Sequence, residues 1–177
     1  MRIIAGTLGG RQFASPPGHR THPMSDKMRG GLFNALGDIT GLTVLDAFAG
    51  SGALGLEALS RGASHVTAID IDKKATDTQA KNASDLNLSS SYKSIRAAVS
   101  GWSDNNEYEL FDIVFVDPPY DDLQTTSLDK IVRHVKKSGL LILSWPGGQQ
   151  TYQFNNMRQV KVQNYGDSQL VFYRKKQ

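Results

Sequence analysis

Short apolar runs alternate with amphipathic segments through the middle of the chain. Strands are predicted where the apolar runs are short, and helices where apolar positions recur every three or four residues. The predicted strands are residues 42–46, 65–70, 112–116 and 140–144, and the predicted helices are residues 53–61, 73–84 and 125–137, the last ending near Gly139. Strands that alternate with helices indicate a parallel sheet with helices on both faces, an α/β fold. The residues before strand 112–116 are interpreted as an acidic loop.

The two ends of the chain follow a different pattern. Gly9 and Gly10 lie between the apolar pair at residues 3–4 and the segment of residues 11–13, which predicts a small β-hairpin closed by the loop SPPG at residues 15–18. Near the other end, two alternating runs flank the sequence YGDS, which predicts an antiparallel hairpin at the end of the sheet. We therefore divide the chain into an N-terminal extension, residues 1–20, and one main domain, residues 21–177.

A glycine-rich loop follows the first predicted strand. Gly50, Gly52 and Gly55 have the spacing GxGxxG between a strand and a helix, and Asp70 ends the next strand. This arrangement predicts a site for an adenosine-containing cofactor whose ribose hydroxyls donate to the Asp70 carboxylate. By themselves, the glycines and Asp70 fit a nicotinamide or flavin dinucleotide as well as other cofactors of this kind.

Asp46 distinguishes between these cofactors. It ends the first strand four residues before Gly50, where a dinucleotide would place its pyrophosphate, and a carboxylate there would repel phosphate groups. A cofactor without phosphate and with a positive amino group would instead be attracted. S-adenosylmethionine meets both conditions and carries a sulfonium that an acidic pocket tolerates, so it is the predicted cofactor.

The sequence DPPY, residues 117–120, supplies candidate catalytic groups. Its two prolines end the preceding strand because neither can donate a backbone hydrogen bond, which leaves Asp117 at the edge where open α/β sheets bind ligands. The Asp117 carboxylate and the Pro118 carbonyl could each accept a hydrogen bond from the exocyclic amine of a nucleobase and direct its nitrogen toward a methyl donor. The Tyr120 ring could stack on a base that has been taken out of its helix.

Composition and charge narrow the function classes. The chain has no cysteine, which excludes disulfides, thiolate zinc sites and a cysteine nucleophile and agrees with a cytoplasmic location. The histidines lack the spacing of metal ligands, and the apolar run at the N terminus is too short for a signal peptide or a membrane span. Residues 1–29 and 158–177 are each basic with a net charge of +4, against +3 for the whole chain. Such ends are either simply solvated or bind a polyanion.

With these motifs in view, the chain resembles the RsmD family of small-subunit (16S) rRNA guanine-N2 methyltransferases, which are class I, Rossmann-like enzymes. The resemblance covers nearly the whole chain and rests on MRIIAGTLGGRQF, VLDAFAGSGALGLEALSRGA, DIVFVDPPY and NYGDSQLVFYR. It implies a mostly parallel seven-stranded sheet and methyl transfer from S-adenosylmethionine to N2 of a guanine in 16S rRNA. It also implies that the substrate is an assembled small subunit or a late assembly intermediate, and that the enzyme is a monomer that needs no membrane.

The resemblance also implies a role for particular residues, without any metal. The cofactor site would comprise Asp46, Phe48, Gly50, Ser51, Gly52, Asp70, Ile71, Ala97 and Ala98. The catalytic group would comprise Asp117, Pro118, Pro119 and Tyr120. The contacts with RNA phosphates would come from Arg2, Arg11, Arg20 and Arg29.

Three features depart from the pattern of that family. His22 replaces an arginine, which would make a contact there pH-dependent. Gly30 and Gly31 replace better helix formers, which is expected to loosen the helix that Ser25 caps. Ala97 replaces a polar residue that would face the adenine amine, leaving that contact to backbone groups.

Three alternatives stay open at the level of the sequence. A nicotinamide oxidoreductase would explain GxGxxG and Asp70, but it leaves Asp46 and DPPY without a purpose. An amino-methyltransferase could act instead on DNA adenine, a protein amide or another amine, because basic ends do not separate DNA from RNA. A non-catalytic RNA-binding protein that has lost its cofactor is a third possibility, although the acids and glycines of the site are intact.

Overall fold

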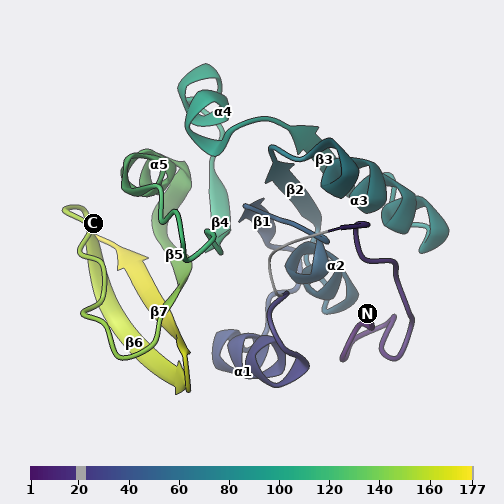
Figure 1. Ribbon diagram of the computed structural model, residues 1–177, viewed down its shortest axis with the longest axis horizontal. Coiled ribbons are helices and arrows are strands. Elements are labelled where there is room, and N and C mark those ends of the chain that lie inside the picture. Colours follow the sequence, from purple (N-terminus) through teal and green to yellow (C-terminus); the bar gives the residue numbers. More distant parts are fainter. Residues whose placement is uncertain (19–22, 177) are drawn as a thin grey trace.

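Seven strands form one sheet through the middle of the molecule (Figure 1). The computed structural model describes residues 1–18 and 23–176. The strand order is β3-β2-β1-β4-β5-β7-β6, in which β7 is antiparallel to both neighbours and the other pairs are parallel. The strands are β1 (Thr43–Ala47), β2 (His65–Asp70), β3 (Tyr92–Arg96), β4 (Phe111–Val116), β5 (Val135–Pro146), β6 (Met157–Tyr165) and β7 (Ser168–Lys175). The predicted fold, including its C-terminal antiparallel hairpin, is confirmed.

Helices cover both faces of the sheet, and each face has its own hydrophobic core. Val44 and Ile113 belong to the core that includes residues of α1, α2 and α3, whereas their neighbours Leu45 and Val114 belong to the core that includes α4 and α5. Successive apolar residues are therefore needed in the central strands, as in other sheets that are buried on both sides. The helices are α1 (Asp26–Leu36), α2 (Ala53–Ser60), α3 (Lys73–Asp85), α4 (Val99–Asn105) and α5 (Thr125–Ile131), followed by the 3-10 turn η1 (Val132–His134).

The register of the sheet brings three predicted site residues to one edge. In the parallel arrangement, Asp46 of β1 lies opposite Ala68 of β2 and Phe115 of β4. Asp70 and Asp117 each come two residues after those partners, so both lie farther toward the carboxyl edge of the sheet. Carboxylates from three adjacent segments therefore converge where ligands bind in open α/β sheets.

Two segments differ from the prediction. The supposed acidic loop before β4 contains β3 and α4, and β3 was missed because this edge strand has the mostly polar sequence YKSIR. The helix predicted over residues 125–137 ends at Ile131, and β5 begins at Val135. Val135 pairs with Phe111 of β4, and the register then shifts so that Leu140 pairs with Ile113. Strand pairing with a large bulge thus replaces the last turns of the predicted helix.

The predicted N-terminal hairpin is present. Arg2 and Gln12 form an antiparallel bridge, and the hairpin side chains Ile3 and Phe13 are buried in the core beside α2. Glu57 of α2 accepts two hydrogen bonds from backbone N–H groups of the hairpin, at 2.7 and 3.1 Å. The hairpin therefore packs tightly on α2 (Figure 1). The division into two domains at residue 20 stays a prediction.

Candidate active site

The glycine loop between β1 and α2 lets the backbone adopt conformations that side chains would hinder. Gly50 and Gly52 have φ values of 52° and 77°, in the left-handed region that favours glycine. A Cβ at Gly52 would overlap the hydroxyl of Tyr92, and a Cβ at Gly55 would lie 2.8 Å from a methyl group of Val66. Backbone conformation or packing therefore requires each glycine of the motif.

Asp70 and Gln79 hold the loop from opposite sides. The Asp70 carboxylate accepts hydrogen bonds from Gly50 N at 2.7 Å and from Asp72 N at 2.9 Å. Gln79, a buried residue of α3, donates from Nε2 to Gly50 O at 2.8 Å. Because each carboxylate oxygen has two lone pairs, Asp70 can still accept hydrogen bonds from a ligand. Sequence reasoning missed Gln79, which lies in mid-helix with no motif around it.

Asp46 is a buried acid with few partners. Its side chain belongs to a residue that is 1% exposed, and among the described residues it accepts one hydrogen bond, from Gly55 N at 3.1 Å. Burial, together with the negative charges of Asp117 and Asp70, raises the pKa of Asp46 to about 8, although the bond from Gly55 opposes this shift. A carboxyl group in this position is stabilised either by a proton or by a cation that replaces lost solvation.

Tyr92 fills the space beneath the glycine loop and was also missed from the sequence. Its hydroxyl is buried and has no hydrogen-bond partner among residues 1–18 and 23–176. Burial, followed by the charges of Asp46 and Asp70, raises the pKa of Tyr92 well above its usual value, so the hydroxyl stays protonated. Tyr92 is therefore a packing partner of Gly52 and Gly55 with a polar group directed toward the acidic site.

The DPPY loop follows β4 at the same edge of the sheet. Burial raises the pKa of Asp117, and the nearby Ser144 hydroxyl acts in the opposite direction. The hydroxyls of Ser144 and Tyr120 are 2.7 Å apart, so Ser144 connects the acid to the tyrosine. Pro118 is buried, and no donor from the described residues contacts its carbonyl oxygen. Two acceptors of the predicted kind are thus present at the end of β4.

Ser144 is a further residue that the sequence analysis missed. Its position follows from the register, because Leu143 of β5 pairs with Val116, which immediately precedes Asp117. A polar residue directly after the apolar run of residues 140–143, within the strand next to β4, was the signal that could have identified it.

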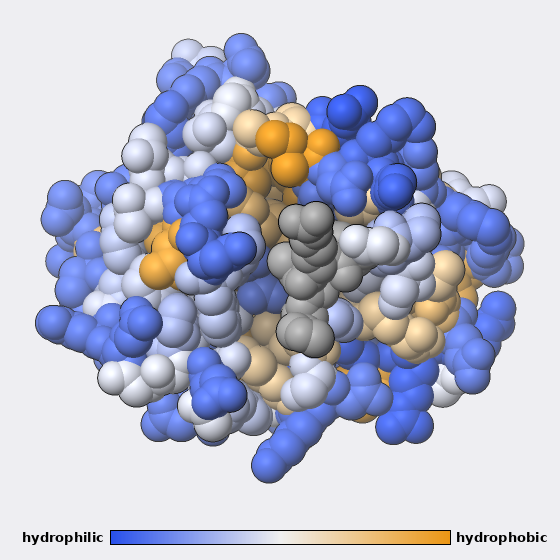
Figure 2. All heavy atoms as spheres, in the orientation of Figure 1, coloured by the Kyte–Doolittle hydropathy of each residue, from blue (hydrophilic) through white to orange (hydrophobic). Residues whose placement is uncertain are grey.

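The other predicted cofactor residues surround the same edge. Phe48 has a φ of 62°, which is unusual for a bulky residue and marks a strained loop. Ser51 is 6% exposed, whereas Ile71 is 68% exposed just after β2. Ala97 N donates to a backbone carbonyl at the end of β2, and Ala98 precedes α4. On the face seen in Figure 2, a hydrophobic area between α4 and β3 interrupts a largely hydrophilic surface.

The four arginines predicted to contact RNA lie in different environments. Arg2 is exposed and pairs with Asp26 at 2.9 Å, and Arg11 is exposed as well. Arg20 lies outside the described residues. Arg29 is fully buried: its guanidinium donates to Asp26 at 3.0 Å and lies 3.8 Å from Glu57. The prediction that Arg29 contacts RNA phosphates is therefore wrong, because its charge is used inside the protein to join α1 to α2.

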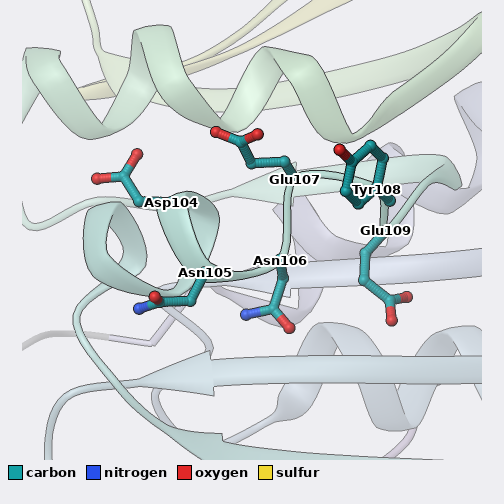
Figure 3. A pocket seen from close by; sticks show the side chains of 6 residues that line it. All are labelled: Asp104, Asn105, Asn106, Glu107, Tyr108 and Glu109. Carbon is teal, nitrogen blue, oxygen red and sulfur yellow. The ribbon is translucent and has the colours of Figure 1, made fainter.

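A separate acidic cavity lies after α4, away from the glycine and DPPY loops. It has a volume of about 280 Å³ and is lined by Asp104, Asn105, Asn106, Glu107, Tyr108 and Glu109 (Figure 3). Its acids are already partnered in part, because Asp104 and Glu107 form ion pairs with Arg133. Across the described ranges, no group of three potential metal ligands comes together. No helix within them is both long enough and apolar enough to span a membrane.

Comparison with known proteins agrees with this geometry. Residues 1–174 match the family described as Conserved hypothetical protein 95. A relative named ribosomal RNA small subunit methyltransferase D, from Buchnera aphidicola, is 34% identical over 145 residues, which cover 80% of this chain and 75% of the relative. The protein of the same name from Escherichia coli K12 is 39% identical over 121 residues, which cover 68% of this chain and 60% of the relative. The chain belongs to the RsmD family.

Solved structures of other proteins share the fold of this chain. An Escherichia coli protein described as a methyltransferase superimposes with a TM-score of 0.88 at 29% identity, covering 99% of this chain and 97% of that one. Membership of the RsmD family confirms the predicted enzyme class, an S-adenosylmethionine-dependent methyltransferase, and excludes the alternative of a nicotinamide oxidoreductase.

Proposed function

We propose that the protein transfers a methyl group from S-adenosylmethionine to the exocyclic N2 of a guanine in small-subunit ribosomal RNA. The observation that carries the proposal is the convergence of Asp46, Asp70 and Asp117 at one edge of the sheet, next to the DPPY loop. The names of the relatives from Buchnera and Escherichia coli support a small-subunit RNA as the substrate.

The residues of the glycine loop fit S-adenosylmethionine. Asp46 is buried with one hydrogen-bond donor among the described residues, so an ammonium group beside it would supply the missing partner and lower its pKa. Asp70 is fixed by two backbone N–H groups in a position to bind ribose hydroxyls. Phe48, Ser51, Ile71, Ala97 and Ala98 would complete the walls of this site. When bound, the cofactor supplies a methyl group on a positively charged sulfur.

The DPPY loop would hold the guanine amine. The Asp117 carboxylate and the Pro118 carbonyl each accept one N–H, which orients the nitrogen lone pair toward the methyl group. As the N–C bond formed, the S–C bond of the methyl donor would break and leave its sulfur as a neutral thioether. The positive charge that develops on the amine would be stabilised by both acceptors, and the surplus N–H proton would then leave through Asp117. Ser144 and Tyr120 position Asp117 and the ring that stacks on the base, while Pro119 keeps the loop rigid.

The proposal also covers the contacts with RNA phosphates, the location of the enzyme and its oligomeric state. Arg2 and Arg11 are exposed on the N-terminal hairpin and would contact phosphates, as would Arg20. We propose that the enzyme acts as a cytoplasmic monomer on an assembled small subunit or a late assembly intermediate, because a small protein that contacts RNA through a surface hairpin can dock on a folded particle.

The test uses small subunits that lack base methylation, radiolabelled S-adenosylmethionine, and digestion of the RNA followed by mass spectrometry. Label on guanine N2 at one position is expected for the wild type, with loss of label for Asp117→Ala. Asp122→Ala, an exposed acid in the same loop, is the matched control and should retain activity. Label on adenine, on DNA or on protein would refute the substrate, and full activity of Asp117→Ala would refute the mechanism.

A further inference from the structure

A basic groove lies at the amino-terminal end of β5, at the opposite end of that strand from Ser144. It has a volume of about 410 Å³. The residues that line it, which define the basic groove, are Ser138, Arg158, Arg174, Lys175 and Lys176. No acid lines it, although the chain as a whole has 17 acidic residues and 20 lysines and arginines.

The topology of the sheet assembles this groove from distant parts of the sequence. Because β7 is antiparallel to its neighbours, its last residues lie beside the first residues of β5 and β6. Arg174 is thus opposite both Leu140 and Arg158. In Figure 1 the C terminus accordingly lies near α5, at the far end of the hairpin from the β6–β7 turn. The bulge of β5 forms the rim, with Ser138 at a φ of 60°.

The cations of the groove are held by neutral groups. Arg174 donates to Ser138 O at 2.8 Å, Lys176 to Asn155 O at 3.0 Å, and Lys175 to Val135 O at 2.6 Å. Within the part of the chain that the structure describes, none of the four basic side chains forms an ion pair with a carboxylate. Four like charges gathered in one depression repel one another, and an anion would remove this repulsion.

We propose that the basic groove binds the phosphate backbone of ribosomal RNA, as a second contact with the same substrate whose guanine enters the DPPY loop. The inference rests on the proposed function. Ser144, which contacts Tyr120, and Leu140, which pairs with Arg174, are separated by four strand residues, or about 13 Å. Because the two places lie toward opposite ends of β5, the RNA must fold around the edge of the protein to contact both, and their separation along the strand is well below the ~34 Å of one turn of a nucleic-acid duplex. Arginine also suits phosphate because it can donate two parallel hydrogen bonds.

The experiment measures binding of fluorescent duplex RNA from the small subunit at several salt concentrations. The test variant is Arg158→Gln/Lys176→Gln, since both side chains are exposed and neither forms an ion pair in the described structure. The control variant, Lys81→Gln/Lys93→Gln, makes the same change in net charge at exposed positions on α3 and β3. If two phosphate contacts are lost, the negative slope of log K against log salt becomes shallower by about 1.8, and affinity at 0.1 M salt falls up to about 60-fold.

The expected result is this loss for the test variant alone, with an unchanged dissociation constant for S-adenosylmethionine and a higher KM for the subunit. Equal slopes for wild type and test variant, or an equal loss in the control, would overturn the inference. Inorganic phosphate serves as a further probe: if it binds with the same affinity as the RNA, the groove is a site for free phosphate and the proposal is wrong. Because binding is measured without methyl transfer, failure of the proposed function would be seen separately, as absence of label on guanine.

Discussion

The raised pKa of Asp46 predicts that binding of S-adenosylmethionine depends on pH. Burial raises the pKa of Asp46 to about 8, so at pH 7 the carboxyl group of the free protein is mostly protonated. An ammonium group beside it favours the ionised form. Binding therefore requires Asp46 to lose a proton, and the affinity should increase with pH until Asp46 is ionised in the free protein as well.

The magnitude follows from the pKa. Ionising a group one pH unit below its pKa costs about 1.4 kcal/mol, which is a factor of ten in affinity. Between pH 5.5 and 7.5 the dissociation constant should fall by nearly two orders of magnitude, and close to one proton should be released for each cofactor bound. The amino group of the cofactor stays mostly protonated in this range because such groups titrate near pH 8.

Calorimetry in buffers of different ionisation enthalpy measures both quantities. Asp46→Asn should bind weakly with almost no dependence on pH, whereas the control Asp77→Asn, which changes an exposed acid of α3, should resemble the wild type. A constant affinity for the wild type, with no proton release, would show that Asp46 does not pair with the cofactor.

The same pKa predicts that the stability of the free protein depends on pH. The unfolded chain ionises this carboxyl near pH 4 and the folded chain near pH 8. The free energy of unfolding should therefore fall as pH rises through this window, and it should fall less in Asp46→Asn.

Three further predictions concern the neighbours of the site. Ser144→Ala removes a hydroxyl that lowers the pKa of Asp117, so the acidic limb of the pH–rate profile should move to higher pH, and kcat measured on that limb should fall about tenfold for a lost interaction of ~1.4 kcal/mol. Gly52→Ala should lower the free energy of unfolding by about 1–3 kcal/mol, because the new side chain is strained at a positive φ and overlaps Tyr92. In a urea titration, the double variant Gly52→Ala/Tyr92→Phe should recover part of this loss. No recovery would contradict the overlap. Arg29→Met should destabilise the protein by about 3–5 kcal/mol because it leaves a buried acid with fewer partners, whereas an unchanged urea midpoint with weaker RNA binding would support the original RNA role.

The sequence predicted the central part of the fold well because its signals there are strong. β1, β2 and β4 are apolar strands buried on both faces, and the glycines after β1 leave few alternatives to a turn into a helix. β3 lacks this signal because an edge strand needs only one partner and tolerates polar residues. The start of β5 was read as helix because Val132 and Val135 continue an apolar spacing of three residues, and only pairing with Phe111 makes the second valine part of a strand.

The residues of the candidate site also fall into those that the sequence predicted and those that it did not. Motif residues such as Asp46 and Asp70 could be predicted because their chemistry depends on positions close together in the sequence. Gln79, Tyr92 and Ser144 could not, because they contact the motif from other elements and their sequence surroundings have no distinctive spacing. The RNA role of Arg29 was an implication of the family resemblance, and burial beside Glu57 instead gives its charge a partner inside the protein.

The glycines of α1 have a packing role that helix propensity does not reveal. Gly30 and Gly31 each weaken a helix by about 1 kcal/mol relative to alanine, which predicted a loosened element. A Cβ at Gly31, however, would overlap the hydroxyl of Tyr165 at the end of β6, while Leu32 and Phe33 are buried in the core. The glycine therefore lets α1 approach the C-terminal hairpin closely, and burial of its apolar face compensates for the lost propensity. This contact places the helix against the C-terminal hairpin, and the loosening expected from propensity stays a prediction. The helix thus joins the N-terminal part of the chain to the strands that carry the basic groove.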